Sequence, residues 1–515
     1  MKKFIILSTT FFVGYFILSL VSTPFWRITH DTVAMHYMAY VIDKFNYVPY
    51  QDIYDQSMPG TYLLHLFIGK IWGYVESSLQ QFNFWMMLIQ FGLNLYIFRF
   101  MSIYGRLASS IIFLLVYISF GLEMSAQRDV VAMTFIIAAL AITQKKQRVS
   151  NTKQTILGTS FLIGLAATIK PQLAIGLPLF ILYLSWNPKF EISKNLKSYL
   201  INCVLGLLST FIPIGLSILW VYMHNGQEEF WWMQKNYLPQ YVELNASHEY
   251  IANPALRFLQ NLKTFFYKIH YWRLSSFILI LGTMVAIKES METRSDKKKF
   301  FWIFNAGLAF LYSLTLIVSG QYFPYHFMPF IYFAVAPFGI FFETTNEKTK
   351  KFIPVSIFAI SLVAINLSIH FRPEIKNFLT GAKPYISYNG KVDRIISSLK
   401  KHTEKHDTIQ VFDWIRGGTV HAILLSELKL ATRFYCDHIF KHHLHTPATK
   451  TIIKDKLLGV MEKSPPKFIL ESLTHVTPKG PNTSKDLPES VRSFIENNYH
   501  ILDHQKEFIL YKRRM

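Results

Sequence analysis

Ionisable side chains gather between the first apolar run, residues 4–22, and the next one. Asp31 follows that run by about nine residues and precedes an amphipathic stretch, 33–45, that suits a membrane surface. Partial desolvation raises the pKa of a carboxylate and makes it a useful base. An aspartate before a helical stretch is also the commonest helix cap. The two roles are compatible, so Asp31 is a candidate for both.

Two turns between later apolar runs carry further charges. Arg128 and Asp129 open the run 130–143, and such a pair at the mouth of a span fits an anionic headgroup. A helix cap and an interfacial anchor are the alternatives for these two residues. Lys170 stands alone before Pro171, where it suits a lipid phosphate as a point charge or snorkels to the headgroups.

A late aromatic turn holds His326 beside Tyr322 and Tyr325. These side chains have the polar groups to hydrogen-bond a phosphate, although aromatic residues at an interface are also ordinary belt residues. The segment after Asp31 adds three more polar candidates for a site, namely Tyr50, Asp52 and Asp55.

The composition indicates what kind of protein positions these groups. The 515 residues carry 53 Lys and Arg against 32 Asp and Glu, a net charge of +21, yet 51% are hydrophobic and only 17% are charged. A nucleic-acid-binding protein carries its basic face on a polar body, and a disordered chain lacks such apolar content. The composition excludes both classes and predicts a multispanning membrane protein with basic loops.

Apolar runs long enough to span a bilayer recur along the chain. We predict about eleven transmembrane helices, at 4–22, 80–101, 107–122, 130–143, 155–169, 172–186, 199–223, 273–288, 300–319, 326–343 and 352–370. With the N-terminus inside, the inner loops hold nineteen Lys and Arg, whereas the short outer turns hold only Arg128 and Lys170. This pattern follows the positive-inside rule. The weaker run 61–76 is predicted to be an interfacial helix.

Three larger pieces then lie outside: a first outer loop at 23–79, a middle outer loop at 224–272 and a tail from 371 to 515. The tail has strand-like runs at 408–412, 467–470 and 507–511, with helical patterns at 391–401 and 488–498. We therefore predict a transmembrane domain at 1–370 and a small α/β extracytoplasmic C-terminal domain at 371–515. In the tail, His438 and His442 have a spacing that can bind a metal, although a solvated histidine cluster is the better interpretation.

Taken together and in order, these pieces resemble a known family. They are Asp31 after the first span, Pro49-Tyr50-Gln51-Asp52 with Pro59-Gly60, Arg128-Asp129, Lys170-Pro171, and Tyr325-His326-Phe327 with Pro329. The set resembles integral-membrane glycosyltransferases of the GT-C class, and most of all the glycosyltransferase family 39 proteins related to protein O-mannosyltransferases and lipid A aminoarabinose transferases. The resemblance covers roughly residues 1–345 and less specifically the tail.

The resemblance implies transfer of a sugar from a polyprenyl-phosphate donor to an envelope glycan, lipid or protein acceptor outside the inner membrane of a bacterium. Asp31 matches the acid that activates the acceptor, Asp129 a second carboxylate of the site, and Lys170 a basic residue facing the donor phosphate. His326 falls in the turn facing the donor cavity. Many members have two adjacent acids in the first loop, but His30 and Thr32 flank Asp31 here, so Asp52 and Asp55 are both candidates for the second acid.

The residue types suit this chemistry. Displacement at the anomeric carbon needs a base for the acceptor and a stabilised leaving phosphate, and a carboxylate base on the front face gives inversion. Lys170, Arg128 and His326 can take the place of a metal, and Mg²⁺ or Mn²⁺ held by carboxylates is the alternative. A flippase for lipid-linked sugars is the rival function. We see no internal repeat in the chain, which disfavours a transporter.

Overall fold

The computed structural model describes most of the chain. The described residues are 2–27, 31–145, 152–185, 192–242, 251, 253–271, 296–342, 357, 360–361, 363–365, 373–381, 390–413, 418–436, 447–473 and 487–514.

The chain forms two compact units whose segments alternate along the sequence. Unit 1 comprises Met1–Phe25, Phe82–Leu216 and Pro254–Ala382, and unit 2 comprises Trp26–Gln81, Ser217–Asn253 and Lys383–Met515. Most of the first outer loop therefore belongs to the same unit as the tail. Each unit is described by itself.

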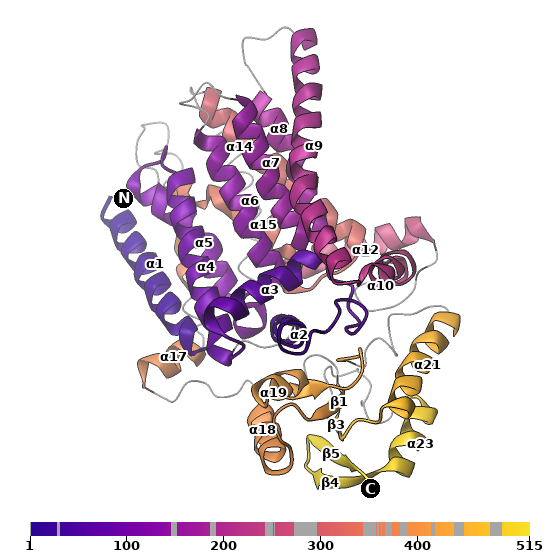
Figure 1. The fold of residues 1–515 in the computed structure, drawn as a ribbon. Helices are drawn as coiled ribbons and strands as arrows, with labels where there is room; N and C mark the ends of the chain where they lie inside the picture. The colour runs from indigo at the N-terminus through magenta and orange to yellow at the C-terminus, as the bar shows by residue number, and fades with distance from the viewer. Residues whose placement is uncertain are drawn as a thin grey trace. The chain divides into compact units, whose positions relative to one another are not determined.

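Unit 1 is built from helices (Figure 1). They are α1 (Lys2–Ser22), most of α4 (Glu76–Ile97), α5 (Ile103–Ser119), α6 (Arg128–Lys145), α7 (Thr152–Ile169), α8 (Leu177–Ser185), most of α9 (Ile192–Met223), α12 (Pro254–Tyr271), α14 (Asp296–Ser319), α15 (Met328–Val335) and α17 (Pro373–Leu379). Short 3-10 turns join several of them: η1 (Thr23–Phe25), η2 (Leu122–Met124), η4 (Pro171–Gly176), η6 (Pro324–Phe327) and η7 (Ala336–Phe342).

Four segments among the described residues are long and apolar enough to cross a membrane: Lys2–Phe25, Leu196–Met223, Lys298–Ser319 and Pro324–Phe342. They match the predicted spans 4–22, 199–223, 300–319 and 326–343. Two shorter apolar helices, Ile103–Ser119 and Pro171–Ser185, lie at the predicted spans 107–122 and 172–186.

The predicted number of eleven spans is not confirmed. The predicted spans 80–101, 130–143 and 155–169 are helical, as α4, α6 and α7. They are not among the four segments that are both long and apolar enough to cross a membrane. The span 273–288 lies outside the described residues, and so does most of 352–370.

Helix α4 has a low hydropathy because it carries polar residues. These residues bond to neighbouring helices. Gln90 donates to the hydroxyl of Thr134 on α6 at 2.8 Å, and Asn94 accepts from the Tyr332 hydroxyl on α15 at 2.6 Å. One polar group of each amide is thus paired across a helix interface.

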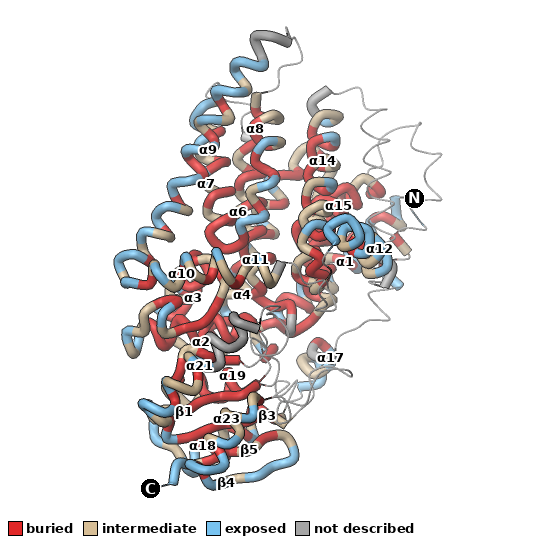
Figure 2. The backbone as a smooth tube through the Cα atoms, turned by 90° about the vertical axis from the view of Figure 1, so that its right-hand side faces the viewer, coloured by how far each residue is buried: buried red, intermediate tan, exposed pale blue. Residues whose placement is uncertain are grey.

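The outer faces of unit 1 remain apolar. Along α9, Leu200, Leu208 and Phe211 are exposed, the last at 60%. Figure 2 shows exposed stretches along this helix. On its other face α9 approaches α7 closely, since a Cβ at Gly164 would lie 2.4 Å from the carbonyl oxygen of Thr210. An apolar exposed face on a tightly packed helix is what a lipid environment requires.

Unit 2 combines helices with one sheet. Its helices are α2 (Asp31–Phe45), α3 (Pro59–Trp72), the first turn of α4, the end of α9, α10 (Gln227–Trp232), the π-helical turn η5 (Met233–Tyr237), α11 (Leu238–Val242), α18 (Gly390–His402), α19 (Thr419–Leu425), α21 (Pro447–Lys463) and α23 (Glu489–Asn498). Its strands are β1 (Thr408–Phe412), β2 (Lys429–Leu430), β3 (Phe468–Ser472), β4 (Tyr499–His504) and β5 (Phe508–Arg513).

The five strands have the order β2-β1-β3-β5-β4. Strand β1 pairs in parallel with β2 and β3, whereas β5 is antiparallel to β3 and β4. Helices α18 and α19 cover one face of the sheet, and α21 and α23 cover the other (Figure 1). The predicted α/β character of the tail is confirmed, and its strand-like runs correspond to β1, β3 and β5.

Candidate functional site

The turn that carries Arg128 and Asp129 is held by two neighbouring helices of unit 1. The Tyr117 hydroxyl on α5 donates to Oδ1 of Asn83 on α4 at 2.5 Å and accepts the backbone N–H of Ala126 at 2.8 Å. Ala126 has a φ of 54°, in the left-handed region that non-glycine residues rarely adopt. Helix α6 then begins at Arg128. These contacts determine where the carboxylate of Asp129 lies.

Two prolines place the cationic candidates. The residue before a proline is restricted to extended backbone, and Lys170, which precedes Pro171, has φ −138° and ψ 93°. Helix α7 therefore ends directly before Lys170. Phe323 precedes Pro324 and is likewise extended, and η6, which begins at this proline, carries His326.

The structure brings Asp129, Lys170 and His326 together. Nζ of Lys170 lies 3.0 Å from Oδ2 of Asp129, and Nδ1 of His326 lies 3.2 Å from Oδ1. The three side chains are mostly buried, with exposed fractions of 3% for Asp129, 11% for Lys170 and 15% for His326. The ring of Tyr325 completes the group, 4.4 Å from the His326 ring and 6.0 Å from Nζ of Lys170. We call these four residues the Asp129 cluster.

The chemistry of the Asp129 cluster follows from these contacts. A carboxylate only accepts hydrogen bonds, so Nδ1 of His326 carries the proton that it shares with Asp129. Nε2 is then the ring nitrogen that gains or loses a proton. Lys170 supplies a charge in a site of low exposure, where attraction to an anion is stronger than in water. Half-buried Arg128, beside Asp129, adds a second cation.

Asp31 lies in unit 2, as the first residue of α2, and is buried. A carboxylate in the first turn of a helix faces the free backbone N–H groups and the positive end of the helix dipole. This position agrees with the capping alternative. The role of Asp31 as a base stays a prediction.

Asp55 lies in a second buried group of unit 2. Its Oδ2 accepts the Tyr62 hydroxyl at 3.0 Å and the backbone N–H of Ser57 at 3.1 Å, and its Oδ1 accepts the Tyr435 hydroxyl at 3.4 Å. Tyr50, also fully buried, donates to the carbonyl oxygen of Ser57 at 2.7 Å. We call Asp55, Ser57, Tyr62 and Tyr435 the Asp55 cluster.

Asp52 has a different environment from Asp55. It is half-buried, and its carboxylate accepts the backbone N–H of Val48 at 2.7 Å, while its own N–H donates to the carbonyl oxygen of Val48 at 2.9 Å. This pair of bonds closes a turn, the usual task of aspartate in a loop. Of the two acids that the sequence left open, Asp55 has the buried setting of a functional carboxylate.

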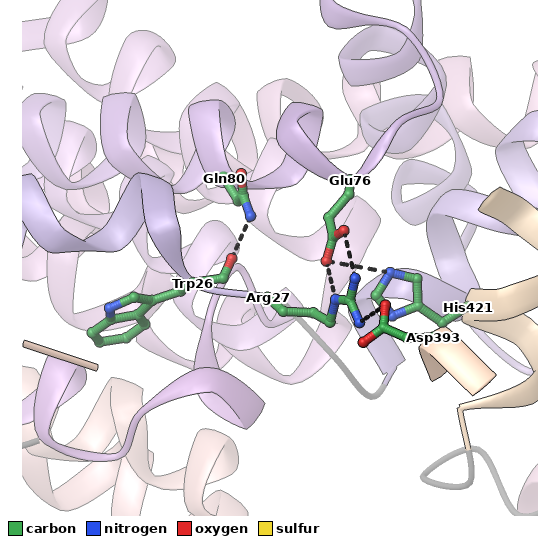
Figure 3. Close-up of polar contacts among 6 residues, drawn as sticks. All are labelled: Trp26, Arg27, Glu76, Gln80, Asp393 and His421. Carbon is green, nitrogen blue, oxygen red and sulfur yellow. Dashed lines mark hydrogen bonds and ion pairs between the residues drawn. The ribbon is translucent and has the colours of Figure 1, made fainter. Parts of the chain in front are cut away.

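A polar network around Arg27 joins the first outer loop to the tail within unit 2 (Figure 3). The guanidinium pairs with both oxygens of Glu76, and its Nη1 donates to Oδ1 of Asp393 on α18 at 2.9 Å. Burial alone would lower the pKa of Arg27, but the hydrogen bonds and charges of Glu76 and Asp393 outweigh this effect, and the pKa is raised. Burial, with the charge of Arg27, lowers the pKa of His421 on α19 to about 3, so this imidazole is neutral.

The part of the chain that the structure describes contains no group of three or more His, Cys, Asp or Glu side chains arranged to hold a metal ion. The predicted Mg²⁺ or Mn²⁺ stays a prediction. His438 and His442 lie outside the described residues.

Sequence reasoning missed the partners of Asp55 and Arg27. Tyr435 is 380 residues from Asp55, and Asp393 is 366 residues from Arg27. Neither pair belongs to a local motif, so no signal in the sequence pointed to them.

No protein-family model and no curated protein sequence matches the chain. Among solved structures, the chain is similar to ArnT from Cupriavidus metallidurans bound to undecaprenyl phosphate. The TM-score is 0.60 at 9% identity, over 98% of this chain and 97% of that one. The apo oligosaccharyltransferase from Archaeoglobus fulgidus has a TM-score of 0.48 at 11% identity, over 90% of this chain and 69% of that one. The likeness to ArnT, a GT-C protein, shows that this chain has the GT-C fold, as its sequence predicts.

Proposed function

We propose that this protein transfers a sugar from a polyprenyl-phosphate donor to an acceptor at the outer face of the bacterial inner membrane. The observation that carries the proposal is the buried contact of Asp129 with both Lys170 and His326, on a fold shared with a structure that binds undecaprenyl phosphate. The transferred sugar is a hexose or a pentose.

The Asp129 cluster is the proposed site for the donor phosphate. As the bond between the anomeric carbon and the phosphate oxygen breaks, the leaving phosphate gains one negative charge. Lys170 and Arg128 oppose that charge. Asp129 holds Lys170 by an ion pair and His326 by a hydrogen bond, so we assign it an orienting role.

Asp31 is the proposed base. It takes the proton from the acceptor hydroxyl or amine, whose lone pair then forms the new bond to the anomeric carbon. The electron pair of the old bond leaves with the phosphate oxygen. Attack opposite the leaving group inverts the anomeric configuration.

The test uses purified protein in liposomes with radiolabelled undecaprenyl-phosphate sugars, supplied one at a time, and an envelope glycolipid fraction as acceptor. We expect label to move from one donor to the acceptor with the wild type and at least a hundredfold more slowly with Lys170→Met. Lys153→Met, at the exposed other end of α7, is the matched control. Movement of intact donor across the bilayer without a labelled product would favour the rival flippase instead.

A further inference from the structure

The chain that follows β1 and α19 lies along the first outer loop within unit 2. The carbonyl oxygen of Leu428 accepts the Tyr37 hydroxyl at 3.0 Å, and that of Arg433 accepts the backbone N–H of Tyr54 at 2.7 Å. We call residues 428–436 the tail segment. Its backbone and the first outer loop are thus joined by hydrogen bonds at both ends of the segment.

Arg433 ties the tail segment to two loops at once. Its Nη2 donates to the carbonyl oxygen of Tyr50 at 2.5 Å, and its Nη1 lies 3.1 Å from Glu229 of the middle outer loop. The guanidinium also lies over the Tyr54 ring, 5.2 Å from its centre. A planar guanidinium that bonds and stacks in this way restrains its partners in more than one direction.

The same segment brings Tyr435 to Asp55. The phenol is buried, with 3% of the residue exposed, and donates to Oδ1 of a carboxylate that is itself 2% exposed. Tyr62 and the backbone of Ser57 occupy the other oxygen. Asp55 is therefore oriented on both oxygens, and one of the two groups that orient it comes from the C-terminal part of the chain.

The pKa of the Tyr435 phenol depends on its burial and on nearby charges. Burial raises the pKa of the Tyr435 phenol well above its ordinary value, and the charges of Asp55 and Asp31 raise it further. The phenol thus stays protonated and remains a donor at any physiological pH.

We propose that Asp55 is the second acid of the transfer reaction and that Tyr435 is the residue that positions it. The C-terminal domain is then part of the catalytic apparatus rather than an appended module. This inference rests on the proposed function, because Asp55 acts with Asp31 on the incoming acceptor.

The test compares Tyr435→Phe with a matched control, Tyr499→Phe. Tyr499 is equally buried and donates to the carbonyl oxygen of Pro466 at 2.7 Å, away from Asp55. A hydrogen bond to a charged group is strong enough for its loss to lower kcat about ten- to hundredfold. We expect that loss in Tyr435→Phe alone, with the KM for the lipid-linked donor within about twofold of wild type and a Tm equal to that of Tyr499→Phe.

A second pair of variants identifies the acid. Asp55→Asn is expected to lower kcat more than Asp52→Asn, and adding Tyr435→Phe to Asp55→Asn is expected to lower it no further. Equal kcat in the two tyrosine variants, or a greater loss in Asp52→Asn, overturns the inference while the proposed function stands. A wild type that transfers none of the donors refutes the proposed function, and this inference with it.

Discussion

Replacing Lys170 with methionine, alone and together with Asp129→Asn, distinguishes the effect of the Asp129 cluster on stability from its effect on sugar transfer. The variant keeps most of the length of the side chain but removes its charge, and leaves the Asp129 carboxylate, 3% exposed, with His326 at 3.2 Å. Removing one partner of a buried ion pair costs about 3–5 kcal/mol, because the remaining charge loses its compensation. For a unit of this size, such a loss lowers Tm on the order of 10 °C.

The double variant Asp129→Asn/Lys170→Met removes the uncompensated charge together with its partner. We expect it to recover more than half of the lost Tm, since a neutral pair of similar volume is cheap to bury. Its transfer activity stays as low as that of Lys170→Met, because the proposed phosphate ligand is absent from both.

Thermal unfolding in detergent, followed by tryptophan fluorescence, measures these differences. Lys153→Met, exposed near the start of α7, the helix that ends just before Lys170, is the control and should unfold like the wild type. The reasoning is refuted by a wild-type Tm in Lys170→Met, or by a double variant no more stable than the single one.

Three further predictions follow from individual contacts. Asp31→Asn is expected to abolish transfer at an unchanged expression level, and a rate near that of wild type in a donor-consumption assay would remove Asp31 from its role as base. Burial alone would raise the pKa of Glu229, but the hydrogen bonds and charges of Arg433 and Lys456 outweigh this effect, and the pKa is lowered. The stability that ionised Glu229 contributes is therefore present above the ordinary glutamate pKa and is lost as pH falls through the lowered value. Glu229→Gln should therefore lower Tm at pH 7, and the difference from wild type should shrink as pH falls through the lowered pKa, as Tm measured across pH would show. Gly164→Leu should lower Tm by on the order of 10 °C or prevent expression, because its Cβ alone meets the Thr210 carbonyl of α9. Gly158→Leu on the same helix should not, because a Cβ there makes only an ordinary contact, 3.8 Å from Cδ1 of Ile142.

The sequence predicted the tail better than the number of spans. Strands β1 and β3 are short apolar runs bounded by polar turns, so local pattern was sufficient to find them. Helix α4, by contrast, carries Gln90 and Asn94, which bond to α6 and α15 and not to solvent. Hydropathy cannot distinguish such a helix from a polar one, because the side chains that its amides bond to are distant in sequence.

The candidate site was predictable in its parts but not in its contacts. Asp129, Lys170 and His326 were each selected from their turns, and the structure brings them into one cluster. The proposed choice of Asp55 over Asp52 rests on burial and on Tyr435, and both follow from tertiary packing over 380 residues of chain. The local pattern of residue types cannot reveal such a contact.

The most direct measurement of the central claim follows both products of a single donor in proteoliposomes by mass spectrometry and NMR. The account predicts that each molecule of undecaprenyl-phosphate sugar consumed yields one undecaprenyl phosphate and one glycosylated acceptor of inverted anomeric configuration, and that Asp31→Asn yields neither. Donor that stays chemically intact with the wild type, or a product that retains its anomeric configuration, would contradict it.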